Sequence, residues 1–379
     1  MPGTSADDPV ERIPSDDPVV AWPAPAAVAR KGRGAVSNLA HRFEPVQRLA
    51  EPETLAEDDA DRPAIATSVT FEVARSIITR NDSPDIGFDR SINPYRGCEH
   101  GCVYCYARPT HSYLNLSPGL DFETKLVAKR NAAELLLKEL AAPGYTPGLI
   151  MVGVNTDAYQ PVERALKITR GVLEVLAAAR HPFGLVTKSS LVERDIDLVA
   201  AMAQMNLASV SISITSLDPG LARILEPRAA SPQRRLRTVR TLAAAGVPVS
   251  VNLAPVIPFV NEPEIEAIVD AAAHAGARNV HYTVVRLPWE VSPLFEEWLR
   301  THFPDRAQRV MNRIRDMRGG KNYDASFGRR MTGEGTWAGL IEQRFRRART
   351  RHGFGDSWPG LRTDLFVRPR PPTPQMDLF

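Results

Sequence analysis

Short apolar runs alternate with amphipathic segments along the middle of the chain, and this alternation limits the possible folds more than any other feature. The apolar runs lie at 149–154, 183–187, 208–214, 247–254 and 279–285, and a weaker strand is expected before residue 98. Helical patterns lie near 123–141, 162–179, 193–206, 232–246 and 262–276. Strands joined by connections of helix length pair in parallel. The sequence therefore predicts an α/β fold, a partial TIM-like (β/α)6 barrel whose chemistry lies at the carboxyl ends of the strands.

Two of the expected strands alternate apolar with small polar residues. In 208–214, valine and isoleucine alternate with Ser209, Ser211 and Ser213, and 247–254 repeats the pattern with Ser250 and Asn252. A period of two places each set on its own face of the sheet. We expect the apolar sets to face the helices, which leaves a polar lumen suited to a charged cofactor and substrate.

All three cysteines of the chain fall within eight residues, at Cys98, Cys102 and Cys105, with the spacing C-x3-C-x2-C. Thiolates this close together converge on one soft-metal centre. Gly97 and Gly101 favour a loop here, because two glycines in one turn disfavour a helix that would simply bury a cysteine stripe.

The residues alone leave two metal centres open. A structural zinc of the Cys3His type would take His100 or His111 as its fourth ligand, and the chain would then be a non-catalytic nucleic-acid-binding protein. A [4Fe–4S] cluster held by three thiolates would instead leave one iron free for an external ligand.

The surroundings of the cysteines resemble a known family. C-x3-C-x-aromatic-C, with Tyr104 as the aromatic, resembles the signature of the radical SAM superfamily. The flanking stretches 93–98 and 104–108 are similar to the branch that contains spore photoproduct lyase and DNA repair photolyase-like proteins. This resemblance covers residues 65–350 and implies a [4Fe–4S] cluster on the three cysteines, with S-adenosylmethionine on the open iron. It also implies reductive cleavage to a 5′-deoxyadenosyl radical, with flavodoxin or ferredoxin as the one-electron donor.

The same resemblance suggests residues that bind the cofactor. Asn155, Thr156 and Asp157 follow the run 149–154, where the family holds the cofactor amine, although the common Gly-Gly-Glu is absent. Lys188 and Ser189 resemble a Thr-Lys-Ser element of spore photoproduct lyase. Helix capping is the alternative role for Thr156, Asp157 and Ser189.

Three further residues are candidates for the site. Ser213 matches the fourth-strand serine of the lyase, and Tyr104 lies within the cysteine motif. Arg228 follows a short helix after the fourth strand, where its guanidinium fork suits a carboxylate or a phosphate. Tyr282 and Arg286 end the sixth strand and are candidates to face the substrate.

The identity of the hydrogen donor is open. Spore photoproduct lyase uses an additional cysteine for this purpose, and the chain has no fourth cysteine. A tyrosine such as Tyr106, Tyr159 or Tyr282 would have to replace it, or the reaction differs. The resemblance therefore does not assign the lyase reaction itself.

Charge is distributed unevenly. Residues 1–70 contain 7 Lys and Arg against 12 Asp and Glu, whereas residues 300–370 contain 17 against 7. A basic C-terminal block suggests an anionic partner such as damaged or modified nucleic acid, and a solvated helical face is the alternative.

Composition divides the chain into four segments. Residues 1–64 are expected to be disordered or arm-like, with a basic Gly/Arg stretch at 30–35 that either docks on the core or on nucleic acid, or is an ordinary basic patch of the tail. Residues 65–290 form the radical SAM barrel, and 291–353 form a helical, basic extension. A proline-rich tail, 354–379, ends with Gln-Met-Asp-Leu-Phe, from Gln375 to Phe379.

The final pentapeptide looks like the peptide by which bacterial DNA repair proteins dock on the replicative sliding clamp. A tail folded on its own core is the alternative. No apolar signal core begins the chain and no apolar run is long enough to span a bilayer. We therefore expect a cytoplasmic protein, where reduced thiols and an oxygen-sensitive cluster survive.

Overall fold

The computed structural model describes residues 29–43, 65–355 and 360–370. Its main sheet has seven strands in the order β10-β9-β8-β7-β6-β3-β2. Six of them run parallel, and β2 is antiparallel to β3. The predicted partial (β/α)6 barrel is confirmed. Its strands are β2 (Ile78–Arg80), β3 (Arg90–Ile92), β6 (Ile150–Val152), β7 (Phe183–Thr187), β8 (Ala208–Ser213), β9 (Val249–Val256) and β10 (Asn279–Val284).

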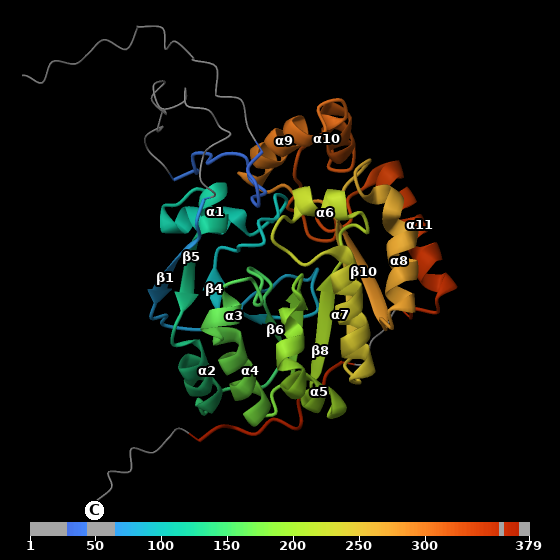
Figure 1. Cartoon of the computed structure of the whole chain (residues 1–379). Coiled ribbons are helices and arrows are strands. Elements are labelled where there is room, and N and C mark those ends of the chain that lie inside the picture. The colour runs from blue at the N-terminus through green and yellow to red at the C-terminus, as the bar shows by residue number, and fades with distance from the viewer. Residues whose placement is uncertain (1–28, 44–64, 356–359, 371–379) are drawn as a thin grey trace, which may run out of the picture.

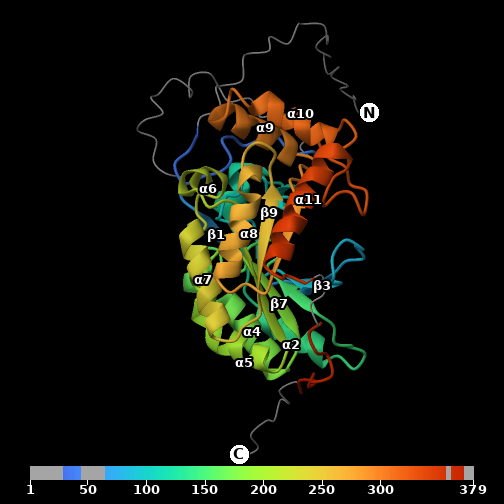
Figure 2. The ribbon, with the colours of Figure 1, turned by 90° about the vertical axis from the view of Figure 1, so that its right-hand side faces the viewer.

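Helices connect the parallel strands and pack on the sheet (Figures 1 and 2). The longer ones are amphipathic, and α4, for example, buries Val172, Leu173 and Leu176. The predicted helix 162–179 is interrupted at Lys167, which has a left-handed backbone conformation. The connecting helices are α2 (Ala132–Ala141), α3 (Glu163–Leu166), α4 (Ile168–Ala178), η4 (Ser190–Asp195), α5 (Ile196–Gln204), α6 (Pro219–Leu225), α7 (Pro232–Ala244), η5 (Glu262–Glu264) and α8 (Ile265–His274).

The alternation in β8 and β9 separates two environments, as predicted. Val210 and Ile212 are fully buried in the main core, to which α7 and α8 contribute. Ser209 and Ser211, which alternate with them, are half-buried on the opposite face. The strands therefore have one apolar face toward the helices and one polar face.

A second, three-stranded sheet corrects one prediction. The helix expected over 123–141 is broken: α1 (Leu120–Thr124) ends, Lys125–Lys129 forms β5, and α2 begins at Ala132. Strand β5 pairs in parallel with β1 (Ser68–Glu72) and antiparallel with β4 (Tyr95–Arg96). The physical reason is the alternation in Lys-Leu-Val-Ala-Lys, which buries Leu126 and Ala128 on one face.

The C-terminal region adds three helices, α9 (Val291–His302), α10 (Ala307–Asp316) and α11 (Gly335–Arg351). Figure 2 shows α11 beside α8, with α9 and α10 above them at one end of the barrel. Phe295, Trp298 and Leu299 bury one stripe of α9. No helix in the part of the chain that the structure describes is long and apolar enough to cross a membrane.

Residues 360–370 run across the opposite end of the barrel. The Arg362 N–H donates to the carbonyl of Asn206, and the Val367 N–H donates to that of Ala179, each at 2.9 Å. Both carbonyls precede the amino ends of strands. The chain therefore leaves its last described residue far from the carboxyl ends of the strands (Figure 1).

Candidate metal and cofactor site

The parallel strands bring the predicted site residues to one end of the barrel. The cysteine loop, residues 97–105, follows β3 and β4, while Asn155 follows β6, Lys188 follows β7 and Ser213 ends β8. The connection between α6 and α7 also meets this loop, because the Arg228 N–H donates to the His100 carbonyl at 3.3 Å. Residues far apart in the sequence thus meet at the carboxyl ends of the strands.

The cysteine loop has the open backbone that its glycines predict. Gly97 and Gly101 have φ angles of 75° and 68°, which a residue with a Cβ rarely adopts. All three cysteines are free thiols, with Cys98 and Cys102 buried and Cys105 half-buried. Burial raises the pKa of Cys98 and raises that of Cys102 to about 12. Such thiols ionise when a metal supplies the compensating positive charge.

Two buried side chains fix the backbone of the cysteine loop. Arg108, the first residue of η3 (Arg108–Leu114), donates to the carbonyls of Cys102 at 2.9 Å and Gly101 at 3.1 Å. Gln160 accepts from the Glu99 N–H at 2.9 Å and donates to the Gly97 carbonyl at 3.2 Å. Neither role could be predicted, because one buried arginine or glutamine has no distinctive spacing.

The Gly/Arg stretch of the N-terminal arm packs directly on this loop. The fully buried carboxylate of Glu123 accepts from the N–H groups of Gly34 at 3.0 Å and Ala35 at 2.8 Å. It also accepts from Arg108 at 2.5 Å. A Cβ placed on Gly34 would lie 1.8 Å from the carbonyl oxygen of Gly101. Of the two predicted partners of this stretch, the structure shows the core.

Asp157 is bonded within the protein on both carboxylate oxygens. Oδ1 accepts from the Thr187 hydroxyl at 2.7 Å, and Oδ2 accepts from the Lys188 N–H at 2.8 Å. His100 Nδ1 lies 3.1 Å from Oδ2. Burial alone would raise the pKa of Asp157, but His100 and these donors outweigh it and lower the pKa to about 2. Asp157 therefore joins the cysteine loop to the end of β7, and it does not cap a helix.

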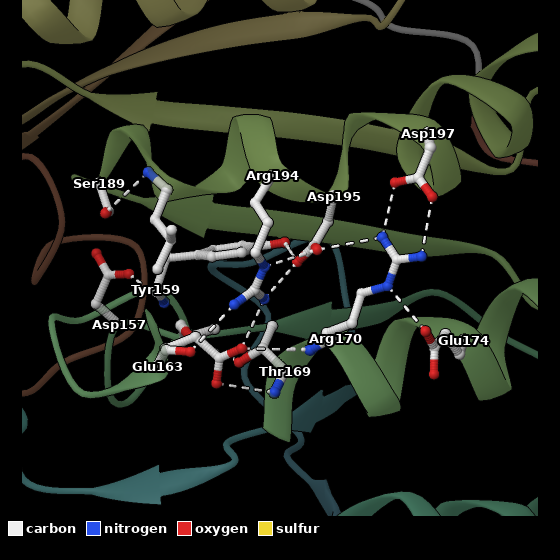
Figure 3. A network of polar contacts seen from close by, with 12 residues as sticks. Asp157, Tyr159, Glu163, Thr169, Arg170, Glu174, Ser189, Arg194, Asp195 and Asp197 are labelled. Carbon is white, nitrogen blue, oxygen red and sulfur yellow. Dashed lines mark hydrogen bonds and ion pairs between the residues drawn. The ribbon is translucent and has the colours of Figure 1, made fainter. Parts of the chain in front are cut away.

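A buried polar network continues from Asp157 toward the helices, and Figure 3 shows it. The Tyr159 hydroxyl donates to Asp195 at 3.0 Å, and Arg194 bridges Asp195 and Glu163, at 2.7 Å to each. Arg170 binds Asp197 at the edge of the network. Tyr159 is thus committed to a structural network of η4, α3 and α4.

The other candidate tyrosines lie in different surroundings. Tyr282 packs at a tilt against Phe345 of α11, with 4.6 Å between ring centroids and 50° between ring planes. Tyr106 follows Cys105 directly and is 45% exposed, and its hydroxyl donates to the Val154 carbonyl after β6. The guanidinium of Arg286 lies 5.2 Å from the Tyr106 ring centroid. Of the three tyrosines, Tyr106 is the one beside the cysteines, at the carboxyl ends of the strands.

Tyr104 connects the cysteine motif to a second buried ion pair. Its hydroxyl donates to Glu226, which pairs with Arg235. Thr215 also donates to Glu226, at 2.6 Å. Burial alone would raise the pKa of Glu226, but Arg235 and Lys188 outweigh it and lower the pKa to about 2. Sequence analysis did not single out Glu226 or Arg235 as partners of the motif.

The remaining candidates fall into two groups. Thr156 donates to the Tyr95 carbonyl at 3.2 Å, Ser189 accepts from the Leu191 N–H at 3.2 Å, and Arg228 donates to Glu99 at 3.1 Å. By contrast, the side-chain polar atoms of three candidates make no hydrogen bond within the described residues. These three are Asn155, Lys188 and Ser213.

The thiols suit a cluster better than a single ion. Within residues 29–43, 65–355 and 360–370, no three Cys, His, Asp or Glu side chains lie close enough to share one metal ion. His111 Nε2 lies 2.9 Å from the Lys125 carbonyl, and His100 faces Asp157. The structural zinc alternative therefore gains no support. A polynuclear cluster fits the donor set, because it takes three soft thiolates through different irons.

Comparisons with known proteins agree with this site. Residues 92–272 match the family model described as Radical SAM superfamily. An uncharacterised protein of Mycobacterium tuberculosis is 37% identical over 224 residues, which are 59% of this chain and 66% of the relative. An uncharacterised protein of Methanocaldococcus jannaschii is 27% identical over 59% of this chain and 79% of its own length. The chain thus spans just under two thirds of the mycobacterial relative.

Solved structures show the same fold. A point mutant of spore photoproduct lyase superposes with a TM-score of 0.53 at 16% identity, over 76% of this chain and 80% of the lyase. A lyase mutant with bound AdoMet and dinucleoside spore photoproduct gives 0.50 at 15% identity, over 75% and 79%. Radical SAM proteins use a [4Fe–4S] cluster and S-adenosylmethionine. Residues 92–272 of this chain thus resemble the radical SAM superfamily in sequence, and the fold and the cysteine loop agree with that match.

Proposed function

We propose that the protein is a radical SAM enzyme that acts on nucleic acid. The observation that carries this proposal is one loop of three free, largely buried thiols whose backbone is fixed by Arg108 and Gln160. Cys98, Cys102 and Cys105 would hold the [4Fe–4S] cluster. When bound, the reduced cluster and S-adenosylmethionine supply a 5′-deoxyadenosyl radical that abstracts hydrogen from a substrate.

The side chains without protein partners would contact the cofactor. Asn155 and Ser213 offer an amide and a hydroxyl at the ends of β6 and β8. Burial alone would lower the pKa of Lys188, but Cys102 and Glu226 raise it, so the ammonium group stays charged and suits a carboxylate. Thr156, Asp157 and Ser189 would position these groups through their own hydrogen bonds.

Two further candidates would act from the cysteine side of the site. Tyr104 would support the cofactor as part of the buried unit with Glu226. Arg228 is held by Glu99, and part of its side chain remains accessible for an anionic group. Tyr106 is the best placed of the three tyrosines to donate hydrogen, because it follows Cys105 directly and its hydroxyl lies at the end of β6.

Nucleic acid is the proposed substrate class. The basic charge of residues 300–370 supports it. One protein of similar fold is a spore photoproduct lyase complexed with dinucleoside spore photoproduct. For this chain we propose damaged or modified nucleic acid as the substrate. Arg318 belongs to this basic stretch but adds no surface charge, since it is buried and donates to the carbonyls of Val285 and Arg329.

Two protein partners are part of the proposal. Radical SAM enzymes use an external reductant, and flavodoxin or ferredoxin would serve as the donor. Residues 375–379 lie outside the described part of the chain, and we propose that they bind the sliding clamp. Residues 360–370 support this, because they lie at the end of the barrel opposite the site (Figure 2).

The decisive test is reductive cleavage of S-adenosylmethionine. Anaerobically reconstituted protein, reduced with dithionite, should release 5′-deoxyadenosine. Cys102→Ala should abolish release, and His111→Gln should retain it, since this histidine is not a proposed ligand. Release that is equal with Cys102→Ala, or absent from the wild-type protein with its cluster intact, would refute the proposal.

A further inference from the structure

Three aromatic rings from distant parts of the sequence meet on the surface. Phe43 ends the described arm, Tyr113 lies in η3, and Trp289 lies between β10 and α9. They are 53%, 68% and 66% exposed. The rings of Phe43 and Tyr113 lie 5.4 Å apart, centroid to centroid. We call these three residues, with Arg42 between them, the aromatic platform.

The guanidinium of Arg42 contacts all three rings of the aromatic platform. Its guanidinium lies 4.7 Å from the ring centroid of Phe43, 5.4 Å from that of Tyr113 and 4.7 Å from that of Trp289. Nη1 donates to both carboxylate oxygens of the buried Glu290, at 3.0 and 2.9 Å. The Arg42 N–H donates to the same carboxylate at 3.1 Å. The platform is therefore preorganised, and its positive charge is largely offset within the protein.

Packing within the described residues does not account for this arrangement. Trp289 has a φ of 45°, in the left-handed region that costs a residue with a large side chain free energy. The strained backbone nevertheless places most of an indole in solvent. Trp298, two turns into the next helix, is fully buried. Preorganised aromatic and arginine side chains that remain exposed are typical of binding surfaces.

The aromatic platform is close to the candidate site. Trp289 is three residues after Arg286, whose guanidinium stacks on Tyr106 beside Cys105. Tyr113 lies in the helix that begins with Arg108, the residue that fixes the cysteine loop. Figure 1 shows the arm passing between α1 and α9 at this end of the molecule. A polymer that enters the site is therefore well placed to cross the platform.

We infer that the aromatic platform stacks the bases of single-stranded nucleic acid next to the substrate nucleotide. This inference rests on the proposed function and adds the strand form and its docking surface. Every base has a π-face, so exposed rings bind single strands without a sequence requirement. Because Glu290 offsets the charge of Arg42, the platform contributes stacking more than phosphate attraction. Residues 44–64, which follow Phe43, contain no aromatic residue that could stack there instead.

The test measures binding of a short, fluorescein-labelled oligothymidylate to the full-length protein. Fluorescence anisotropy reports the binding at several salt concentrations. Trp289→Gly suits the positive φ, so the fold should survive, and Trp289→Phe keeps a ring. We expect Trp289→Gly to weaken binding about tenfold, the order of effect for one lost stacking partner, and Trp289→Phe to restore most of it. The salt dependence should keep its slope, because no phosphate contact is removed.

Phe71→Ala is the matched control. Phe71 is also an exposed ring, 45% accessible, with the Arg130 guanidinium 4.5 Å from its centroid, but it lies on β1. The Phe71→Ala variant should bind oligothymidylate like the wild type. An abasic oligomer of equal length should bind Trp289→Gly and the wild type with equal affinity. Equal affinity of Trp289→Gly and the wild type for oligothymidylate would overturn the inference, as would no binding at low salt. Binding requires no cofactor, so S-adenosylmethionine cleavage tests the proposed function separately.

Discussion

Replacing Gly34 with alanine tests how the arm supports the cysteine loop. The new Cβ would lie 1.8 Å from the Gly101 carbonyl oxygen. No side-chain rotation relieves this contact, because the Cβ is fixed to the backbone of residue 34 and the oxygen belongs to the backbone of Gly101. The arm must therefore move away. It then loses the bonds from Gly34 and Ala35 to the buried carboxylate of Glu123.

The size of the effect follows from these two bonds. Each is a hydrogen bond to a charged group, worth about 1.5–3 kcal/mol, so the docked arm loses about 3–6 kcal/mol. Such a loss raises the population of the undocked arm at least about a hundredfold, since ~1.4 kcal/mol corresponds to a factor of ten. Trypsin should then cleave faster at Arg30, Lys31 and Arg33.

The cluster should also become less stable. We expect reconstituted Gly34→Ala to bind less iron and to lose its iron–sulfur absorbance faster in air, because the loop that carries Cys98 and Cys102 loses its cover. Gly87→Ala is the control, since a Cβ there meets nothing within 4 Å. Tryptic resistance and iron content equal to those of the wild type would refute the argument.

Three further predictions concern buried charge. Glu226→Gln leaves Arg235 buried without its counter-ion and should lower the free energy of unfolding by about 3–5 kcal/mol in urea titrations. The double variant Glu226→Gln/Arg235→Met should lose less, because it removes the unpaired charge. A smaller decrease for the single variant than for the double variant would contradict this. Burial lowers the pKa of His181 in the folded protein from the ordinary value of 6.5 to about 4. Between pH 6.5 and about 4, the unfolded chain therefore binds more protons at this histidine than the folded protein does. Stability should therefore fall as pH drops from 6.5 to about 4, by about 3 kcal/mol, and His181→Gln should flatten the profile. Lys188→Met should weaken S-adenosylmethionine binding about tenfold in calorimetry while iron content stays unchanged, and unchanged affinity would exclude its proposed role.

The sequence was sufficient for the features that repeat at a fixed period or spacing. Alternating strands and helices predicted six parallel strands, and Gly97 and Gly101 predicted that the three cysteines lie on a loop. The alternation of Val210 and Ile212 with serines predicted which face is polar. Each of these signals is local, so neighbouring residues alone define it.

Features that depend on distant partners were not predictable. Lys125–Lys129 lies within a longer helical pattern, and its short alternation of apolar and polar residues becomes a strand through pairing with β1 and β4. The contacts of Glu123 with Gly34, and of Glu226 with Tyr104, join segments about a hundred residues apart. Asp157 has a carboxylate and a position that suit a cofactor ligand, yet its two oxygens already contact His100 and the Thr187 hydroxyl. The positions of these partners follow from the folded barrel.

The most direct test of the account is the metal content of the three cysteine variants. Protein purified without oxygen should contain about four irons and four sulfides per chain, and Cys98→Ala, Cys102→Ala and Cys105→Ala should each lose them. His111→Gln should keep the full content, because only the three thiols are proposed ligands. One zinc per chain without iron, lost from His111→Gln as well as from the cysteine variants, would contradict the account.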